Sequence, residues 1–102
     1  MISYEVTLQA QPALATAVEN FMRESHIPAI LSTGCFADIR FSRASAGRFR
    51  TGYRADSQAD LNRYLQKHAP RLRAEFVERF PENVSVTRET WVLLQSWKRE
   101  SA

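Results

Sequence analysis

The feature that most constrains the fold is the order in which apolar residues switch between strand-like and helix-like spacing. Apolar residues occupy every second position from Ile2 to Leu8, the pattern of a strand with one buried face. From Pro12 they recur at helical spacing up to His26, and Pro28 is expected to close that helix. The chain is therefore predicted to begin with a strand followed by a helix.

Two further alternating stretches follow the break at "STG". Residues 35–42 place Cys35 and Ile39 on one face, and residues 48–55 place Phe49 and Tyr53 on one face. The intervening "SRASAG" is typical of a hairpin loop. The pattern predicts two paired strands in the middle of the chain.

The C-terminal half returns to helical spacing and then to a strand. Ser57 and Asp60 form a variant capping box, and one helical face then runs from Leu61 to Phe80. The following "FPEN" ends this helix. Residues 84–97, "VSVTRETWVLLQSW", are rich in β-branched and aromatic side chains and predict a last strand.

This β-α-β-β-α-β order predicts an α+β protein of the ferredoxin-like class, a single domain over residues 1–102. Its antiparallel four-stranded sheet would carry two helices on one face. We call the opposite surface the open face. It is predicted to display the residues that alternate with the buried set, namely Glu5, Thr7, Asp38, Arg40, Arg48, Arg50 and Arg54. Trp91 joins them if the last strand keeps the phase that places Ser85, Thr87 and Glu89 on this face.

Two segments, "MISYEV" at the N-terminus and "YLQKHAPRLR" at residues 64–73, resemble those of a small bacterial domain-of-unknown-function family. The residues that carry the resemblance are Tyr4, Glu5, Val6, Tyr64, His68, Ala69, Pro70, Leu72 and Arg73. That family has the dimeric α+β-barrel version of the ferredoxin-like fold. The segment "STGCF" departs from the Pro-Gly-Phe expected before the second strand, and the Trp-bearing tail lies outside the resemblance.

The resemblance implies a homodimer in which two open faces approach each other and enclose a cavity. It implies no activity, because the wider superfamily includes cofactor-free monooxygenases, haem-degrading enzymes, isomerases and ligand-sensing modules. The family itself has no assigned function to carry over to this chain.

The composition narrows the classes of protein further. The chain is 44% hydrophobic and 25% charged, as in an ordinary soluble globular domain. Its apolar runs fall far short of the roughly 20 residues of a membrane-spanning helix, and its N-terminus lacks the pattern of a secretory signal. A single cysteine, Cys35, fits a reducing compartment, so we expect a cytoplasmic protein without membrane attachment.

Motifs for metal, phosphate and nucleophile chemistry are missing from the sequence. Two histidines and one cysteine lack the clustered spacing of a zinc or haem site. Three scattered glycines cannot build a phosphate-binding loop, and no G-x-S-x-G motif is present. We expect no metal and no cofactor, and the question of catalysis stays open because no catalytic constellation can be recognised.

His68 lies on the apolar helical stripe two residues before Pro70. Because Pro70 has no N–H to donate to the carbonyl of Gln66, the helix must bend or restart there. We favour a structural role in which the His68 ring donates to a buried carbonyl or strand residue, and we interpret Tyr64 in the same way. His26 is expected in the last turn of the first helix, where a cation meets the negative end of the helix dipole.

Basic residues are concentrated in the middle of the chain. Residues 40–79 contain ten Lys or Arg against four Asp or Glu, whereas residues 1–39 contain one against four. On the open face we favour ion pairs of the arginines with Asp38, Glu5 and Glu89 around a polar cavity, which could equally hold a small anionic ligand. The candidate ligand-binding residues are Arg40, Arg48, Arg50, Arg54, His68 and Tyr64.

The C-terminal residues Trp91, Leu93 and Trp97 are expected to share one face of the last strand as an apolar patch. Exposed patches of this kind mark interfaces, and Trp is enriched at binding hot spots, so we predict subunit contact. The alternative places Trp91 in the sheet's own core and Trp97 in a frayed C-terminus.

Three functional hypotheses follow. The first is a small homodimeric binding or accessory module with a polar cavity between its subunits. The second is a cofactor-independent monooxygenase or isomerase of the dimeric-barrel type, with His68 or Tyr64 near the substrate. The third, binding to a nucleic-acid backbone, is disfavoured because Phe49 and Tyr53 are predicted to face the helices and so cannot stack on bases.

Overall fold

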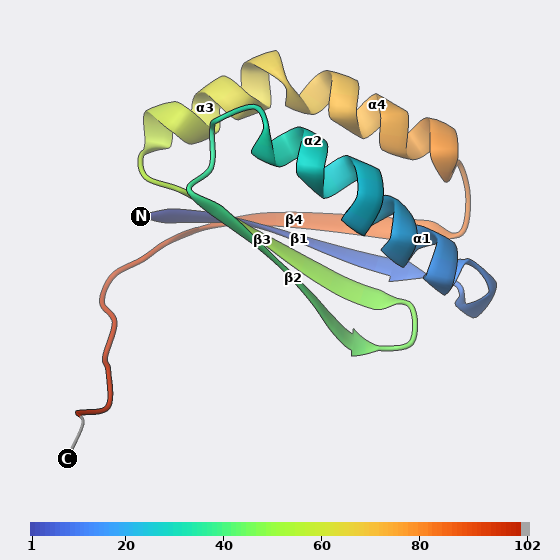
Figure 1. Cartoon of the computed structure of the whole chain (residues 1–102), viewed down its shortest axis with the longest axis horizontal. Coiled ribbons are helices and arrows are strands. Elements are labelled where there is room, and N and C mark those ends of the chain that lie inside the picture. Colours follow the sequence, from blue (N-terminus) through green and yellow to red (C-terminus); the bar gives the residue numbers. More distant parts are fainter. Residues whose placement is uncertain (101–102) are drawn as a thin grey trace.

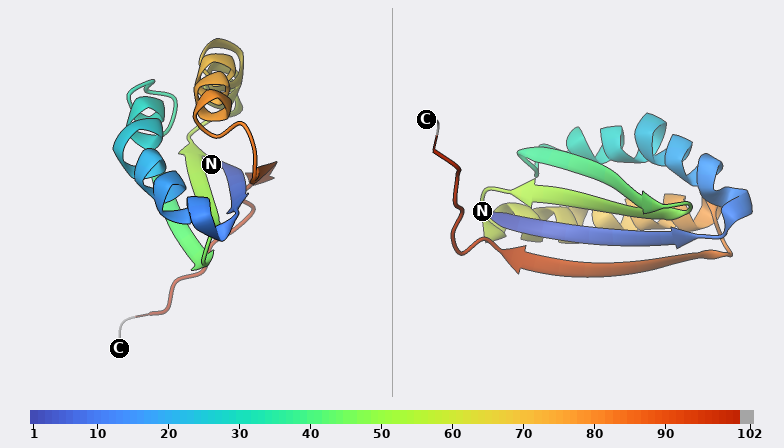
Figure 2. Two further views of the ribbon diagram at one scale, coloured as in Figure 1. Left: turned by 90° about the vertical axis from the view of Figure 1, so that its right-hand side faces the viewer. Right: turned by 90° about the horizontal axis from the view of Figure 1, so that it is seen from below.

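Four antiparallel strands form one layer of the molecule in the order β2-β3-β1-β4. The strands are β1 (Ile2–Ala10), β2 (Asp38–Ser45), β3 (Arg48–Ala55) and β4 (Val84–Val92). In a computed structural model that describes residues 1–100, all helices lie on one side of this sheet, and the other side is uncovered (Figures 1 and 2). The predicted ferredoxin-like α+β fold is confirmed.

The two central strands bury the residues that the alternation predicts. Every second side chain of β1 from Ile2 to Ala10 is buried, and so is every second side chain of β3 from Phe49 to Ala55. These side chains pack beneath the helices, and burial of their apolar surface stabilises the domain. The intervening residues of both strands therefore point to the open face, as predicted.

The first helical segment continues past the position at which the sequence predicted its end. It comprises the 3-10 turn η1 (Pro12–Leu14), α1 (Ala15–Phe21), the π turn η2 (Met22–His26) and α2 (Ile27–Leu31). The prediction that Pro28 closes this helix is wrong. In the π turn the N–H of Ile27 donates to the carbonyl of Met22, five residues back, and this wider turn accommodates Pro28 at the start of α2.

The second helical segment breaks where Pro70 predicted. Helix α3 (Gln58–Lys67) begins at Ser57, whose hydroxyl accepts the N–H of Asp60 at 3.1 Å, so the predicted N-cap is confirmed. His68, with φ −121°, separates it from α4 (Ala69–Arg79). The stripe predicted from Leu61 to Phe80 is thus carried by two helices that both pack on the sheet.

Three predicted boundaries require correction. Strand β2 begins at Asp38, so Cys35 is buried ahead of the strand and not within it. The hairpin loop is shorter than predicted, because β2 extends to Ser45. Gly47, at φ 79°, closes a tight turn next to the Ala10 carbonyl. Strand β4 ends at Val92, five residues before Trp97.

None of the helices in residues 1–100 combines the length and the apolar character needed to cross a bilayer.

Candidate functional site

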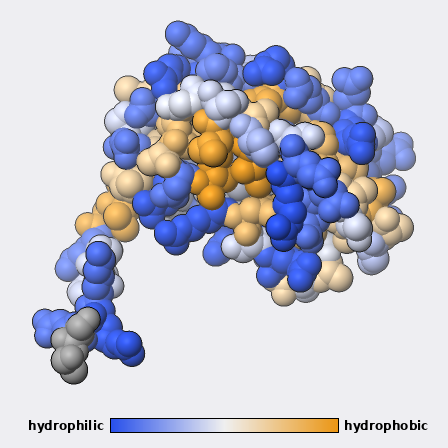
Figure 3. All heavy atoms as spheres, in the orientation of Figure 1, coloured by the Kyte–Doolittle hydropathy of each residue, from blue (hydrophilic) through white to orange (hydrophobic). Residues whose placement is uncertain are grey.

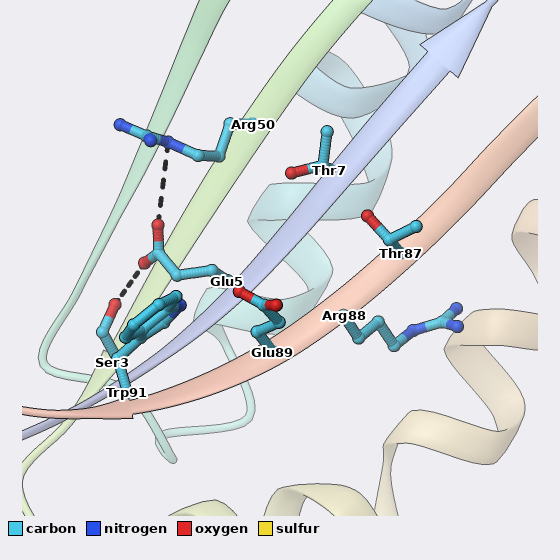
Figure 4. A pocket seen from close by; sticks show the side chains of 8 residues that line it. All are labelled: Ser3, Glu5, Thr7, Arg50, Thr87, Arg88, Glu89 and Trp91. Carbon is cyan, nitrogen blue, oxygen red and sulfur yellow. Dashed lines mark hydrogen bonds and ion pairs between the residues drawn. The ribbon is translucent and has the colours of Figure 1, made fainter.

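A polar hollow lies on the open face over strands β1, β3 and β4, and its lining side chains are labelled in Figure 4. It has a volume of about 360 Å³ and contains Glu5, Arg50, Glu89 and Trp91. We call it the open-face hollow. Except for Arg88, its charged and hydroxyl side chains stand on alternate positions of neighbouring strands, because strand residues alternate between the two sheet faces.

Glu5 stands at the centre of the open-face hollow and is held by neighbours on both sides. The Ser3 hydroxyl donates to its carboxylate, and Arg50 Nε lies 3.7 Å from Glu5 Oε1 (Figure 4). Gly52 is paired beside Glu5 on β3, and a Cβ at Gly52 would lie 2.7 Å from Glu5 Oε2. Glycine therefore leaves the space that the Glu5 carboxylate occupies.

Glu89 lies directly opposite Glu5 on the adjacent strand β4. Two like charges at directly opposed positions destabilise a sheet unless counter-charges are close. Among residues 1–100, Glu89 has no ion pair, and neither has Arg40 or Arg48. The predicted pairing is therefore realised for Arg50 with Glu5 and for Arg54 with Asp38, whose closest atoms are 3.0 Å apart, but not for Glu89.

A second, much smaller cavity of about 40 Å³ lies on the other side of the sheet, beneath the helices. We call it the helix–sheet cavity. Its polar lining residues come from six different elements and are Tyr4, His26, Tyr53, Tyr64, Arg73 and Arg88. A cavity of this size has room for about one water molecule and not for an organic ligand unless the helices move.

Tyr4 connects the sheet to both parts of the second helical segment in this cavity. Its hydroxyl accepts a hydrogen bond from Arg73 Nη2 at 2.8 Å, and its ring centroid lies 6.2 Å from that of Tyr64. The two segments on which the family resemblance rests therefore meet in space at this tyrosine. That resemblance was the one signal in the sequence that pointed to Tyr4 and Arg73, which reasoning from periodicity had not selected.

His26 occupies a position that the sequence did not predict. Because the helix continues to Leu31, the imidazole is not at a helix end but packs between Phe21 and Phe76, each with its ring centroid 5.6 Å away. Burial lowers the pKa of His26 to about 4, with Glu75 opposing the change and Arg88 adding to it. The imidazole is neutral at pH 7, so the predicted role as a capping cation is wrong.

The helix–sheet cavity thus combines neutral polar groups with two cationic side chains, Arg73 and Arg88. His26 Nδ1 is buried without a hydrogen-bond partner among residues 1–100. Burial raises the pKa of Tyr64 to about 12 and that of Tyr53 above its ordinary value, so both phenols keep their protons at pH 7. A protonated phenol can donate a hydrogen bond to a carbonyl oxygen, and a neutral imidazole can accept one from a phenol.

The predicted ligand-binding residues do not form one site. Tyr64 and His68 lie on the helical side of the sheet, whereas Arg40, Arg48, Arg50 and Arg54 lie on its open face, so the sheet separates the two groups. The His68 ring stacks on Tyr64 with centroids 6.4 Å apart. The hydrogen bond predicted for that ring is absent among residues 1–100, and His68 does not line the helix–sheet cavity.

The chain leaves the sheet after Val92 and runs away from the domain, with apolar residues at the base of this tail and polar residues beyond (Figure 3). Trp91, 55% exposed, stands on the open face at the Ser3 end of the hollow. Leu93 follows the strand and Trp97, 80% exposed, lies in the tail, so the prediction that all three share one strand face is wrong.

The described part of the chain, residues 1–100, contains no group of three or more side chains that could hold a metal ion. Neither the open-face hollow nor the helix–sheet cavity offers a cysteine or a pair of histidines. The chemistry available at both places is hydrogen bonding, ion pairing and apolar contact.

Comparison with known families gives a match over most of the chain. The model of a family described as a domain of unknown function (DUF4286) matches residues 1–93, so the resemblance seen in the two sequence segments is confirmed. A comparison with curated proteins finds no match.

Solved structures share the fold at low sequence identity. HapK from Hahella chejuensis is 14% identical with a TM-score of 0.73, covering 99% of this chain and 100% of that chain. A dimeric ferredoxin-like protein from an uncultured marine organism is 8% identical with a TM-score of 0.71, covering 97% and 100%. A monooxygenase from the gene ActVA-Orf6 of Streptomyces coelicolor, in complex with Nanaomycin D, is 16% identical with a TM-score of 0.59, covering 93% and 92%.

Proposed function

The chain belongs to the family described as a domain of unknown function (DUF4286), and from its fold and its open face we propose that it is a cytoplasmic homodimeric binding module. In this proposal two open faces meet and enclose a polar cavity that holds a small anionic ligand. The observation that carries the proposal is the open-face hollow, a concave polar surface of about 360 Å³ on an uncovered sheet.

Several features of the open face support a dimer. An uncovered sheet is normal for an antiparallel fold, but this one carries Glu5 directly opposite Glu89 and the half-exposed ring of Trp91. A second copy would supply counter-charges and cover the indole. The dimeric ferredoxin-like protein of similar fold supports the same assembly.

The charges of the open face favour an anion over a cation as the ligand. Four arginines, Arg40, Arg48, Arg50 and Arg54, face three acidic residues, Asp38, Glu5 and Glu89. A dimer would double this excess of positive charge within one enclosed space, where low solvent access strengthens electrostatic attraction.

The test has two parts. Sedimentation equilibrium at micromolar protein should give the mass of a dimer, and native mass spectrometry of that dimer should reveal a small molecule that is lost on denaturation. In a thermal-shift screen of small carboxylates and phosphates, Arg48→Ala should weaken the response to an anion that binds, whereas Arg71→Ala on the helical side should not. A monomer, or a dimer that responds to no anion and carries no small molecule, would contradict the proposal.

A second function is favoured by a separate observation, the tyrosines and the neutral His26 in the helix–sheet cavity. A cofactor-independent monooxygenase or isomerase would use Tyr64 and His26 to hold a phenolic or carbonyl oxygen after the helices open. The monooxygenase of similar fold, solved with Nanaomycin D, supports testing polycyclic phenols first.

This second function predicts oxygen consumption or spectral change when the protein is mixed with a reduced polycyclic phenol. Tyr64→Phe should lower that rate by tenfold or more if the hydroxyl holds the substrate, since such contacts typically contribute on that scale. Arg50→Ala, on the opposite side of the sheet, serves as the control. Absence of turnover across a panel of such phenols would leave the binding module as the proposed function.

A further inference from the structure

The open face carries one row of directly paired positions that crosses all four strands. In the order β2, β3, β1, β4 this row reads Arg40, Gly52, Glu5, Glu89. It therefore has an unpaired positive charge at one end, a position without a side chain next to it, and two negative charges at the other end. Within residues 1–100 neither Arg40 nor Glu89 has an ion-pair partner.

We propose that two copies pack their open faces about a two-fold axis that runs along the strands, so that Arg40 of each copy pairs with Glu89 of the partner subunit. The inference rests on the proposed homodimer and adds its geometry. Such an axis reverses the strand order of the second copy, so β2 lies over β4 and β3 lies over β1 of the partner subunit. The order of charges along the row of four paired positions selects this axis.

With the strand order reversed, the row of one subunit complements the row of the partner subunit at every position. Arg40 meets Glu89 of the partner subunit, and Glu5 meets Gly52 of the partner subunit, where no side chain stands. A two-fold axis across the strands, placed over this row, would instead oppose Arg40 to Arg40 of the partner subunit and Glu89 to Glu89 of the partner subunit. Opposed like charges disfavour that second arrangement strongly.

The neighbouring row supports the same axis. It reads Asp38, Arg54, Ser3, Trp91 in the same strand order, and its reversal places Trp91 over Asp38 of the partner subunit, next to that subunit's Arg54. The indole N–H can donate to a carboxylate there, and the ring can receive a guanidinium on its face. The half-exposed Trp91 would thus be covered by an ion pair of complementary chemistry.

A charge-swap experiment tests the inference. The variants are Arg40→Glu, Glu89→Arg and the double variant that carries both, and the dimer dissociation constant is measured by sedimentation at low salt. Each single variant should weaken its homodimer about tenfold or more, because each dimer then contains two repulsive contacts. The double variant, and an equimolar mixture of the two single variants, should dimerise within about threefold of wild type, since every opposed pair is again of unlike charge.

The controls are Lys67→Glu and Glu24→Arg, both exposed on the helical side, which should leave the dissociation constant unchanged. Circular dichroism checks that each variant is folded. If the single variants weaken the dimer but neither combination restores it, or if Arg40→Glu pairs more tightly with wild type than with Glu89→Arg, the proposed axis is wrong while the homodimer stands. A wild-type chain that is monomeric throughout overturns the homodimer and the axis together.

Discussion

The two sides of the same sheet are built from alternate residues of the same strands, yet their side chains differ in burial and in pairing. On the helical side, Tyr4, Tyr53 and Tyr64 are buried, and the Tyr4 ring pairs with each of the other two. Arg73 donates a hydrogen bond to the Tyr4 hydroxyl. On the open face, Glu5 stands directly opposite Glu89, and the Trp91 ring is half-exposed. The helical side buries its aromatic side chains, whereas the open face leaves charged groups and an indole ring exposed.

This difference separates the side of the sheet that stabilises the fold from the side on which the proposed association depends. Burial of apolar side chains beneath the helices supplies the folding free energy of the monomer. Charged groups on an exposed sheet contribute little to folding, because solvent screens them, but they can decide which surface fits against another. Substitutions on the two sides should therefore change different measurable quantities.

The largest expected contrast is between a core leucine and an open-face threonine. Leu72 is fully buried, so Leu72→Ala should lower the free energy of unfolding by about 2–5 kcal/mol through lost burial and a residual cavity. Thr87→Ala on the open face should change it by about 0.5 kcal/mol or less. Urea unfolding measures both, and similar losses for the two variants would remove the distinction between the two sides.

Acidification should selectively destabilise the helical side through His26. Its pKa is about 4 in the folded protein and 6.5 ordinarily, so the unfolded chain binds a proton that the folded chain rejects as the pH falls between these values. Stability present above pH 6.5 should decline by about 2–3 kcal/mol toward pH 4, since each pKa unit corresponds to about 1.4 kcal/mol. Urea unfolding of wild type and His26→Phe at pH 7 and pH 4.5 measures this, and a stability difference independent of pH would contradict it.

Removal of a tail tryptophan should affect association and not folding. Trp97 is 80% exposed, so Trp97→Ala should leave thermal unfolding of the monomer unchanged. If Trp97 anchors the partner subunit, the dimer dissociation constant should rise about tenfold, which corresponds to about 1.4 kcal/mol. Lys98→Ala is the neighbouring control, and a change below about threefold for Trp97→Ala would mean that this residue is not an anchor.

Among the substitutions on the helical side, the smallest effect is expected at His68. Its ring stacks on Tyr64 and lacks the buried hydrogen bond that would make truncation costly. His68→Ala should therefore lower the free energy of unfolding by about 0.5–1.5 kcal/mol, the range for an aromatic pair. Denaturant unfolding measures this, and a loss well above 2 kcal/mol would point to a buried polar partner after all.

The sequence predicted the parts of the fold that depend on local periodicity. Alternation in residues 48–55 predicted which side of β3 faces the helices, because one residue's shift would move every apolar side chain into water. The β-branched and aromatic composition of residues 84–97 predicted too long a last strand, because this composition continues beyond the residues that pair with β1. Beyond Val92, within residues 1–100, one backbone hydrogen bond continues the pairing, from the Leu93 N–H to the carbonyl of Met1.

The candidate sites were harder to predict for a similar reason. That Glu5 and Glu89 are neighbours depends on the register of β1 with β4, which lie far apart in the sequence. The burial of His26 depends on a turn that periodicity cannot signal, because Pro28 would end an ordinary helix. The pairing of Arg54 with Asp38 was predictable, since those strands are joined by a short hairpin that fixes their register.

The π turn also determines which spacing of residues can form a straight stripe. In a regular α-helix, positions four apart drift by about 40° per step, so residues at a strict interval of four would wind off the sheet. Val18, Met22, His26 and Ile30 keep this interval through the first helical segment, and all four nevertheless point toward the sheet. The wider turn absorbs the drift. Deletion of one residue between Met22 and His26 would remove the extra residue of the π turn, and Ile30 would then follow Val18 by about three full turns of a regular α-helix. The helix would become shorter, and Ile30 would still point toward the sheet.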